Sequence, residues 1–272
     1  TQNYAAEKPL LDQIEQQFEI YRKTTDEAER TAIYHKIDSL SYEASKFAIP
    51  NEYDKLMAAI GAKGTNAYTG FDMTVYVENI PANQIDNWAK IQADRFENCV
   101  IRGFHTELET VYEEKNMSLT KDPRKVYETV LSALFPHHPY GTQTVLGTQE
   151  DLKNPSITNI KNYHKQWYVP NNMAICLSGD FDPDQMITTI DNFGHLRPNN
   201  NLPKLNLPKE SSITAPIVRE VLGPDAESLT LAWRFPGAAS KEYEILQVVS
   251  QILYNGKAGL IDLDLNQQQK VL

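Results

Sequence analysis

A segment rich in proline and asparagine, residues 197–216, constrains the fold of this chain more than any other sequence feature. It reads RPNNNLPKLNLPKESSITAP and contains four prolines. Proline lacks a backbone N–H and fixes φ, so helices and inner strands rarely continue through such a segment. The segment also shows no helical or strand periodicity. It therefore predicts a linker, placed at 201–216, between a larger unit and the start of a second α/β domain over 217–272.

Two helices are predicted near the beginning of the chain. Apolar residues recur at helical spacing over 10–21 and again over 28–40. Between the two runs, Thr24 is expected to cap the second helix, with Glu27 completing a capping box. The sequence thus predicts a helical hairpin over 1–50.

Helices and strands are both predicted over 51–200, the first α/β domain. The expected helices cover 51–64, 82–96, 123–135, 157–167 and 182–193, and the expected strands cover 65–81 and 173–179. Cys176 is expected to be buried in the second strand. Beyond the linker, a strand is expected at 228–235 and a helix at 240–254. This order predicts an α+β fold in which helices cover one face of a largely antiparallel sheet.

A glutamate-rich stretch, FHTELETVYEEKNM, occupies 104–117 and contains four glutamates. Glu107 and Glu114 are seven residues apart, so on an α-helix they share a face and lie about 10 Å apart along the axis. One small ion could not bind both carboxylates. From the stretch alone, a solvated helix face remains the alternative to a functional site.

Composition excludes several classes of partner. The formal net charge of −10 and the absence of a Lys/Arg cluster disfavour nucleic acid and anionic membranes. No apolar run is long enough to span a membrane, and no signal peptide is visible at Thr1. The chain is therefore expected to be soluble, in an undetermined compartment. A periplasmic or exported location would follow if a signal peptide has been removed.

The histidines and aspartates offer no obvious metal site. None of the six histidines begins or ends an H-x-x-E-H motif. His137 and His138 precede a proline and are interpreted as loop residues, because no third ligand lies at a zinc-like spacing. The aspartates of GDFDPDQ lack the pattern of a calcium loop, and Asp182 is instead expected to cap a helix that begins at Pro183.

Five groups of motifs, in order, resemble the pitrilysin/insulinase family of zinc metallopeptidases, the inverzincins. They are GTNAYTGFDMTVY, ELETVYEEKNM, HPYG with LGTQEDL, YHKQWYVPNNMAICLSGDFD, and LTLAWRFPG with ILYNGKAGLIDLDL. The resemblance covers 51–272 and implies metallohydrolase-like α/β units, in an N-terminal half that closes like a clamshell with a second half or a partner subunit. The hairpin over 1–50 then looks like an insertion.

The resemblance also implies a zinc site. In the family, the two histidines of H-x-x-E-H bind zinc, its glutamate is the general base, and a downstream glutamate is the third protein ligand. That ligand matches Glu114, while Glu107 matches a supporting carboxylate beside the site. Since H-x-x-E-H is absent, it is expected upstream of Thr1. The truncated chain by itself is then expected neither to bind catalytic zinc nor to cleave peptides.

An exposed strand edge in this family pairs with the backbone of a peptide or unfolded polypeptide. The matching positions are Asn66 and Ala67. The leading hypothesis is a zinc-dependent endopeptidase. The alternatives are a non-catalytic, peptide-binding partner subunit of a family peptidase, and a structural scaffold relative.

Overall fold

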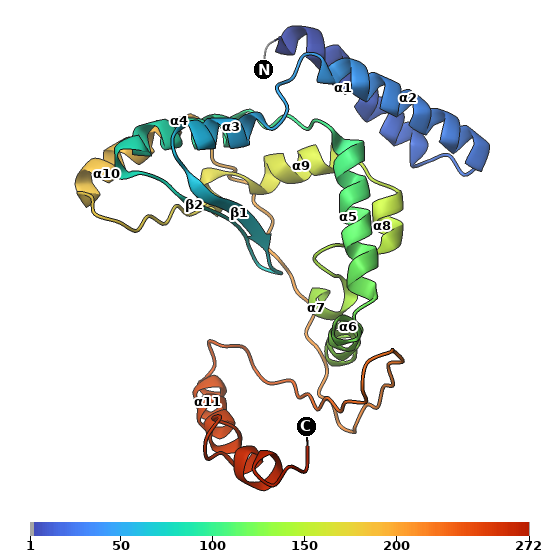
Figure 1. Cartoon of the computed structure of the whole chain (residues 1–272), viewed down its shortest axis with the longest axis vertical. Coiled ribbons are helices and arrows are strands. Elements are labelled where there is room, and N and C mark those ends of the chain that lie inside the picture. The colour runs from blue at the N-terminus through green and yellow to red at the C-terminus, as the bar shows by residue number, and fades with distance from the viewer. Residues whose placement is uncertain (1–2, 272) are drawn as a thin grey trace.

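The computed structural model describes residues 3–271 and is mostly helical, with one small antiparallel sheet (Figure 1). The elements are α1 (Tyr4–Tyr21), α2 (Glu27–Ser45), α3 (Glu52–Ala59), β1 (Lys63–Thr69), β2 (Thr74–Asn79), α4 (Ile85–Glu97), α5 (Phe104–Leu119), α6 (Asp122–Leu134), α7 (Pro139–Thr142), α8 (Gln149–Lys153), α9 (Ile157–Trp167), α10 (Pro183–Ile190) and α11 (Lys241–Leu253). Short 3₁₀ turns follow β2, α9 and α10, and a π turn covers Asp262–Asn266.

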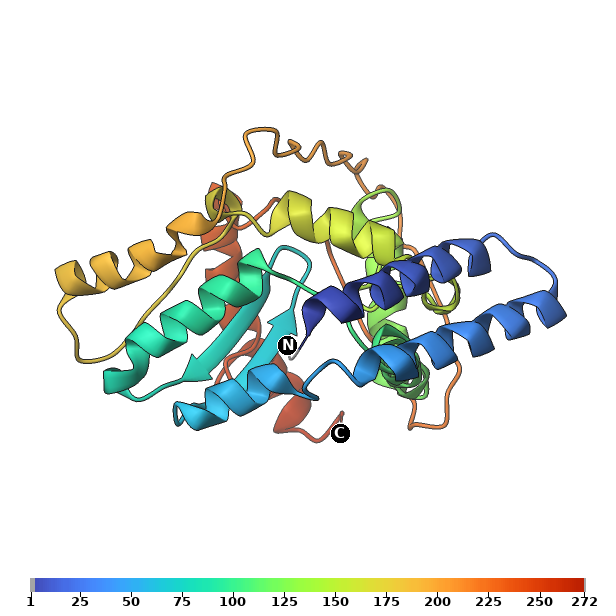
Figure 2. The ribbon, with the colours of Figure 1, turned by 90° about the horizontal axis from the view of Figure 1, so that it is seen from above.

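The predicted helical hairpin is confirmed, and α1 and α2 lie side by side (Figure 2). Its predicted cap is wrong. Asp26, not Thr24, caps α2 by accepting a hydrogen bond from the Glu29 N–H at 2.8 Å. The Thr24 hydroxyl instead donates to the Ile20 carbonyl at the end of α1.

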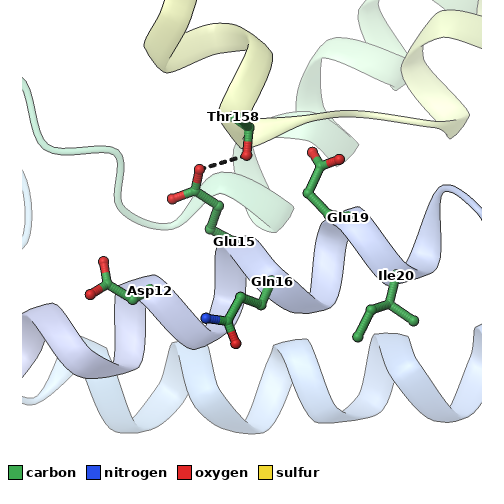
Figure 3. Close-up of a pocket in the computed structure, with 6 residues that line it drawn as sticks. All are labelled: Asp12, Glu15, Gln16, Glu19, Ile20 and Thr158. Atoms are coloured by element: carbon green, nitrogen blue, oxygen red, sulfur yellow. Dashed lines mark hydrogen bonds between the residues drawn. The ribbon is translucent and has the colours of Figure 1, made fainter.

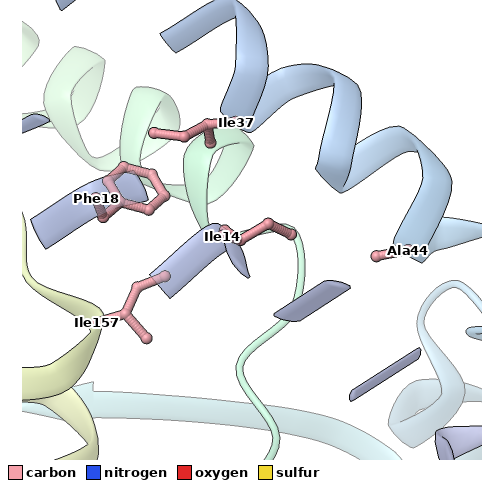
Figure 4. Packing of buried hydrophobic residues seen from close by; sticks show 5 residues of the cluster. All are labelled: Ile14, Phe18, Ile37, Ala44 and Ile157. Atoms are coloured by element: carbon pink, nitrogen blue, oxygen red, sulfur yellow. The ribbon is translucent and has the colours of Figure 1, made fainter. Parts of the chain in front are cut away.

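The main apolar core joins this hairpin to the start of α9 (Figure 4). Its buried residues are Ile14, Phe18, Ile37, Ala44 and Ile157. The ring of Phe18 also packs edge-on against that of Phe104, the first residue of α5, with centroids 5.1 Å apart. The hairpin therefore supports the helix that carries the glutamate-rich stretch.

An ion pair reinforces the same junction. The Glu7 side chain of α1 is almost fully buried and accepts hydrogen bonds from Nε and Nη2 of Arg102, at 2.5 and 2.8 Å. Arg102 lies just before α5, so this bidentate pair ties the chain entering α5 to α1.

The sheet is a hairpin of β1 and β2. The run predicted as one strand over 65–81 folds back after Gly70, whose N–H donates to the Met73 carbonyl. Glu78, in β2, connects the hairpin to the neighbouring helices. Its carboxylate accepts hydrogen bonds from Trp88 and Gln92 of α4 and from Tyr53 of α3. Burial, and then the Glu78 hydrogen bond, raise the pKa of Tyr53 to about 12.

The larger antiparallel sheet expected from the sequence is not present among the described residues. Residues 173–179 and 228–235 are not strands, and Cys176 is exposed rather than buried. A strand needs a neighbour for its backbone hydrogen bonds, and among residues 3–271 only β1 and β2 pair.

Several sequence predictions about helices are confirmed. α9 begins and ends as predicted, Pro123 lies in the first turn of α6, and Asp182 caps α10 with Pro183 at its first turn.

Residues 197–236 contain no helix or strand, and beyond them α11 stands apart from the other helices (Figure 1). None of the helices described between residues 3 and 271 combines the length and apolar character needed to cross a membrane.

Candidate functional site

Helix α5 carries the glutamates singled out by the sequence. It begins after Gly103, whose φ of 56° lies in the left-handed region that favours glycine, and the Glu107 N–H donates to the Gly103 carbonyl. Lys115 of this helix is only 4% exposed, and its side chain contacts Glu128 of α6. The face of α5 that carries Lys115 is therefore packed against the rest of the fold.

The four glutamates of α5 fall into two classes. Glu109 accepts a hydrogen bond from the Tyr34 hydroxyl of α2 at 2.5 Å, and Glu113 accepts one from the Asn116 side chain. Burial, and then the bond to Glu109, raise the pKa of Tyr34. Glu107 and Glu114 are exposed, and their carboxylates have no hydrogen bond or ion pair to any residue that the structure describes.

The described residues do not form a complete zinc site. Between residues 3 and 271, no three or more His, Cys, Asp or Glu side chains gather closely enough to hold a metal. Glu114 is therefore a single candidate ligand. The other ligands expected of an inverzincin have no counterpart in this sequence, which lacks H-x-x-E-H.

The predicted peptide-binding positions lie in β1, all of whose residues are exposed. Asn66 pairs with Val77 and Ala67 with Tyr76, after an irregular step between Lys63 and Asn66. Among the described residues β1 has one neighbour, β2, so its other edge is open. The Ala67 N–H already donates to Asn66 Oδ1 at 2.8 Å, and a peptide pairing with this N–H has to displace that contact.

A charged cluster behind α5 was not predicted from the sequence. The Lys115 ammonium lies 3.3 Å from Oε1 of Glu128 in α6, and Nε of Arg124 donates to the same oxygen at 2.8 Å. Lys115 also reaches the Thr144 hydroxyl at 3.5 Å. Arg124 and Glu128 are four residues apart on a helix, a spacing that could have indicated their pair.

An open hollow of about 550 Å³ lies along α1 and is rich in carboxylates (Figure 3). Glu15 accepts hydrogen bonds from Thr158 and Lys161 of α9, and Glu19 accepts one from Ser156. These contacts attach α1 to α9. Glu15 and Glu19 are therefore engaged in holding the fold.

A further carboxylate, Glu210, fastens the extended segment after α10 to the loop that follows α6. It accepts hydrogen bonds from the backbone N–H groups of His137 and His138, at 2.6 and 2.7 Å, and from the His137 ring. Burial alone would raise the pKa of Glu210, but the donors of His137 and His138 lower it to about 2. His137 thus has a structural partner, in agreement with its interpretation as a loop residue.

The sequence is similar to those of a zinc protease and of a processing-peptidase subunit. The chain is 23% identical over 252 residues to the zinc protease PqqE of Helicobacter pylori, covering 89% of this chain and 56% of that protein. It is 22% identical over 174 residues to the mitochondrial-processing peptidase subunit beta of Neurospora crassa, covering 63% and 36% of the two chains. The chain thus spans about half or less of the length of these relatives.

The fold has a counterpart among solved structures. A crystal structure of a protease from Helicobacter pylori superposes with a TM-score of 0.53 at 24% identity, covering 58% of this chain and 40% of that one. The model of the "Peptidase M16 inactive domain" matches residues 156–270, a range that crosses the predicted linker. Together these findings show that the chain is similar to M16, pitrilysin-like peptidases, with residues 156–270 matching the model of that family's inactive domain.

Proposed function

We propose that the intact protein containing this chain is a zinc-dependent endopeptidase that cleaves peptides or unfolded polypeptides. In this proposal Glu114 is the third protein ligand of the zinc, and Glu107 supports the site from one face of α5. The remaining ligands and the general base come from residues outside this sequence. Zinc, when bound there, would supply an activated water.

The observation that carries the proposal is the contrast within α5. Glu107 and Glu114 are exposed and unpartnered among the described residues, whereas Glu109 and Glu113 have partners. The contacts of Phe18 with Phe104 and of Glu7 with Arg102 hold the start of this helix in place. A carboxylate on a fixed helix can bind a ligand without a large ordering cost.

The open edge of β1 supplies the second part of the proposal. An extended peptide can pair with its free backbone groups, so that affinity comes from main-chain hydrogen bonds and demands no single sequence. Asn66 and Ala67 are the positions proposed to contact the peptide. Since Asn66 Oδ1 accepts the Ala67 N–H, the Asn66 side chain has to rotate before that N–H can bind substrate.

The test is cleavage of an unfolded polypeptide by the intact protein, with and without the chelator 1,10-phenanthroline. We expect the chelator and the substitution Glu114→Gln each to abolish cleavage. The matched control is Glu109→Gln on the same helix, which should retain activity because Glu109 is engaged with Tyr34. Full activity of Glu114→Gln would refute the assigned role.

A second candidate function is a non-catalytic partner subunit that binds peptides. It is favoured by the match to the family's inactive domain and by the similarity to a protein named as a subunit. If the intact protein binds unfolded peptide through β1 but never cleaves it, even with zinc supplied, this second candidate replaces the first.

A further inference from the structure

A cavity of about 440 Å³ lies where the end of β1 meets α6 and the chain around α7. Its walls include Thr69 and Phe71 from the hairpin, Arg124 and Tyr127 from α6, and Tyr140 from α7. Thr69 is the last residue of β1. The cavity therefore adjoins the end of β1, and a peptide paired along this strand would approach it there.

Close packing builds one wall of the cavity. A Cβ atom at Gly141 would lie 2.2 Å from the Phe135 carbonyl oxygen and 2.5 Å from that of Leu131, so only glycine allows α7 to approach the end of α6 this closely. The ring of Tyr140 packs against that of Phe71, with centroids 5.0 Å apart. The wall is thus held from both sides.

The lining of the cavity is close to electrically neutral, although the whole chain has a net charge of −10. Arg124 and Glu128 both line it, and the buried Lys115 lies behind Glu128. Two cations therefore share one carboxylate. Asp72, whose carboxylate accepts from the Tyr140 hydroxyl, belongs to the β1–β2 turn and is not one of the lining residues.

Arg124 has hydrogen-bonding capacity to spare. Its Nε donates to Glu128, and no described residue accepts from its Nη1 or Nη2. A guanidinium stays charged at every physiological pH, and its terminal nitrogens suit a carboxylate. The exposed rings of Phe71 and Tyr127 can cover the aliphatic part of a side chain that enters the cavity.

From these observations we infer that this cavity is a specificity pocket, which selects an acidic side chain of the peptide bound along β1, with Arg124 as its recognition residue. The inference rests on the proposed peptide binding at β1 and adds a preference among substrates. Glu128 limits this preference, because its carboxylate already accepts a hydrogen bond from Nε of Arg124.

Fluorescence anisotropy on the 272-residue chain tests the inference. The probes are extended peptides, acetylated and amidated at their ends, that differ only in a central Glu or Gln. We expect the Glu peptide to bind about five- to tenfold more tightly, as a charge-assisted hydrogen bond at a partly exposed site allows. Arg124→Gln should abolish this difference, and Glu128→Gln should enlarge it.

The control is Lys121→Gln, which removes a positive charge beside the start of α6 from a side chain that does not line the cavity. It should keep the preference for Glu. Because the readout is a ratio of two affinities for one variant, a general loss of stability does not mimic the expected result.

Three outcomes would overturn the inference. Equal affinity for the Glu and Gln peptides, or a preference that survives Arg124→Gln, would leave peptide binding intact and remove the pocket. Failure of every peptide to bind would refute the proposed binding at β1 as well.

Discussion

Helices α1 and α5 both carry several carboxylates, yet they use them differently. On α1, Glu7 pairs with Arg102, Glu15 with Thr158 and Lys161, and Glu19 with Ser156. On α5, Glu107 and Glu114 reach no partner among residues 3–271.

This difference separates carboxylates that hold the fold from carboxylates available to a ligand. A buried or bridging carboxylate stabilises the fold only while its partner is present, and removing the partner leaves a desolvated charge. An exposed carboxylate on a fixed helix contributes little to stability, so its loss should affect function alone.

Replacing Arg102 with alanine should cause the largest loss of stability. The substitution leaves Glu7, whose side chain is 1% exposed, as an unpaired buried charge. We expect a loss of about 3–5 kcal/mol in the free energy of unfolding, measured by urea denaturation. Arg22→Ala is the control, because the Arg22–Glu19 pair is partly exposed and 3.7 Å apart, and it should cost less than about 1 kcal/mol. Equal losses would mean that the Glu7 pair does not hold α1 to α5.

Replacing Phe18 with leucine should have an intermediate effect. Phe18 is fully buried, and the substitution removes its edge-on contact with Phe104 at the start of α5. We expect a loss of about 1–2 kcal/mol, from the aromatic pair and imperfect repacking. Phe71→Leu removes a similar ring pair from a side chain that is 41% exposed, and it should cost less in the same denaturation experiment. A smaller loss for Phe18 than for Phe71 would contradict the assigned core.

Glu210 should make the stability depend on pH in acid. Its folded-state pKa is about 2, below the unfolded value of about 4.3, so its contribution is present above pH 4.3 and is lost as the pH falls towards 2. The melting temperature of Glu210→Gln should therefore approach that of the unsubstituted chain between pH 4.5 and 2.5, and lie below it at pH 6. A difference that stays constant over this range would show that the Glu210 charge does not fasten the segment to His137 and His138.

Glu107→Gln and Glu114→Gln should have the smallest effect on stability, within about 0.5 kcal/mol of the unsubstituted chain. Neither carboxylate has a described partner to lose. Thermal unfolding followed by circular dichroism measures this directly. A loss above about 1 kcal/mol would show that the carboxylate holds the fold through a structural contact, as Glu7 does.

Local patterns predicted the helices well. The period of α9 and the Asp182–Pro183 start of α10 depend on neighbouring residues only, so the sequence contains the necessary information. At α2, two residues could serve as the cap. The structure uses Asp26, because the Thr24 hydroxyl bonds back to the Ile20 carbonyl of α1.

Features that depend on distant residues were predicted less well. The apolar run at Cys176 suits a buried strand, but a strand forms only where a partner strand is available, and this segment has none among the described residues. The cavity at Arg124 combines residues from the β1–β2 hairpin, α6 and α7, and no local pattern indicates that they meet. The glutamate spacing of α5, in contrast, is local, and the structure places Glu107 and Glu114 on one exposed helix as expected.

The zinc content of the intact protein tests the central distinction most directly. It should be measured by atomic emission on the purified protein and on its Glu114→Gln and Glu109→Gln variants. We expect about one zinc per molecule for the unsubstituted protein and for Glu109→Gln, and a large loss for Glu114→Gln. Equal zinc content in Glu114→Gln and the unsubstituted protein would contradict this expectation, and Glu114 would then be one charge on a solvated helix face.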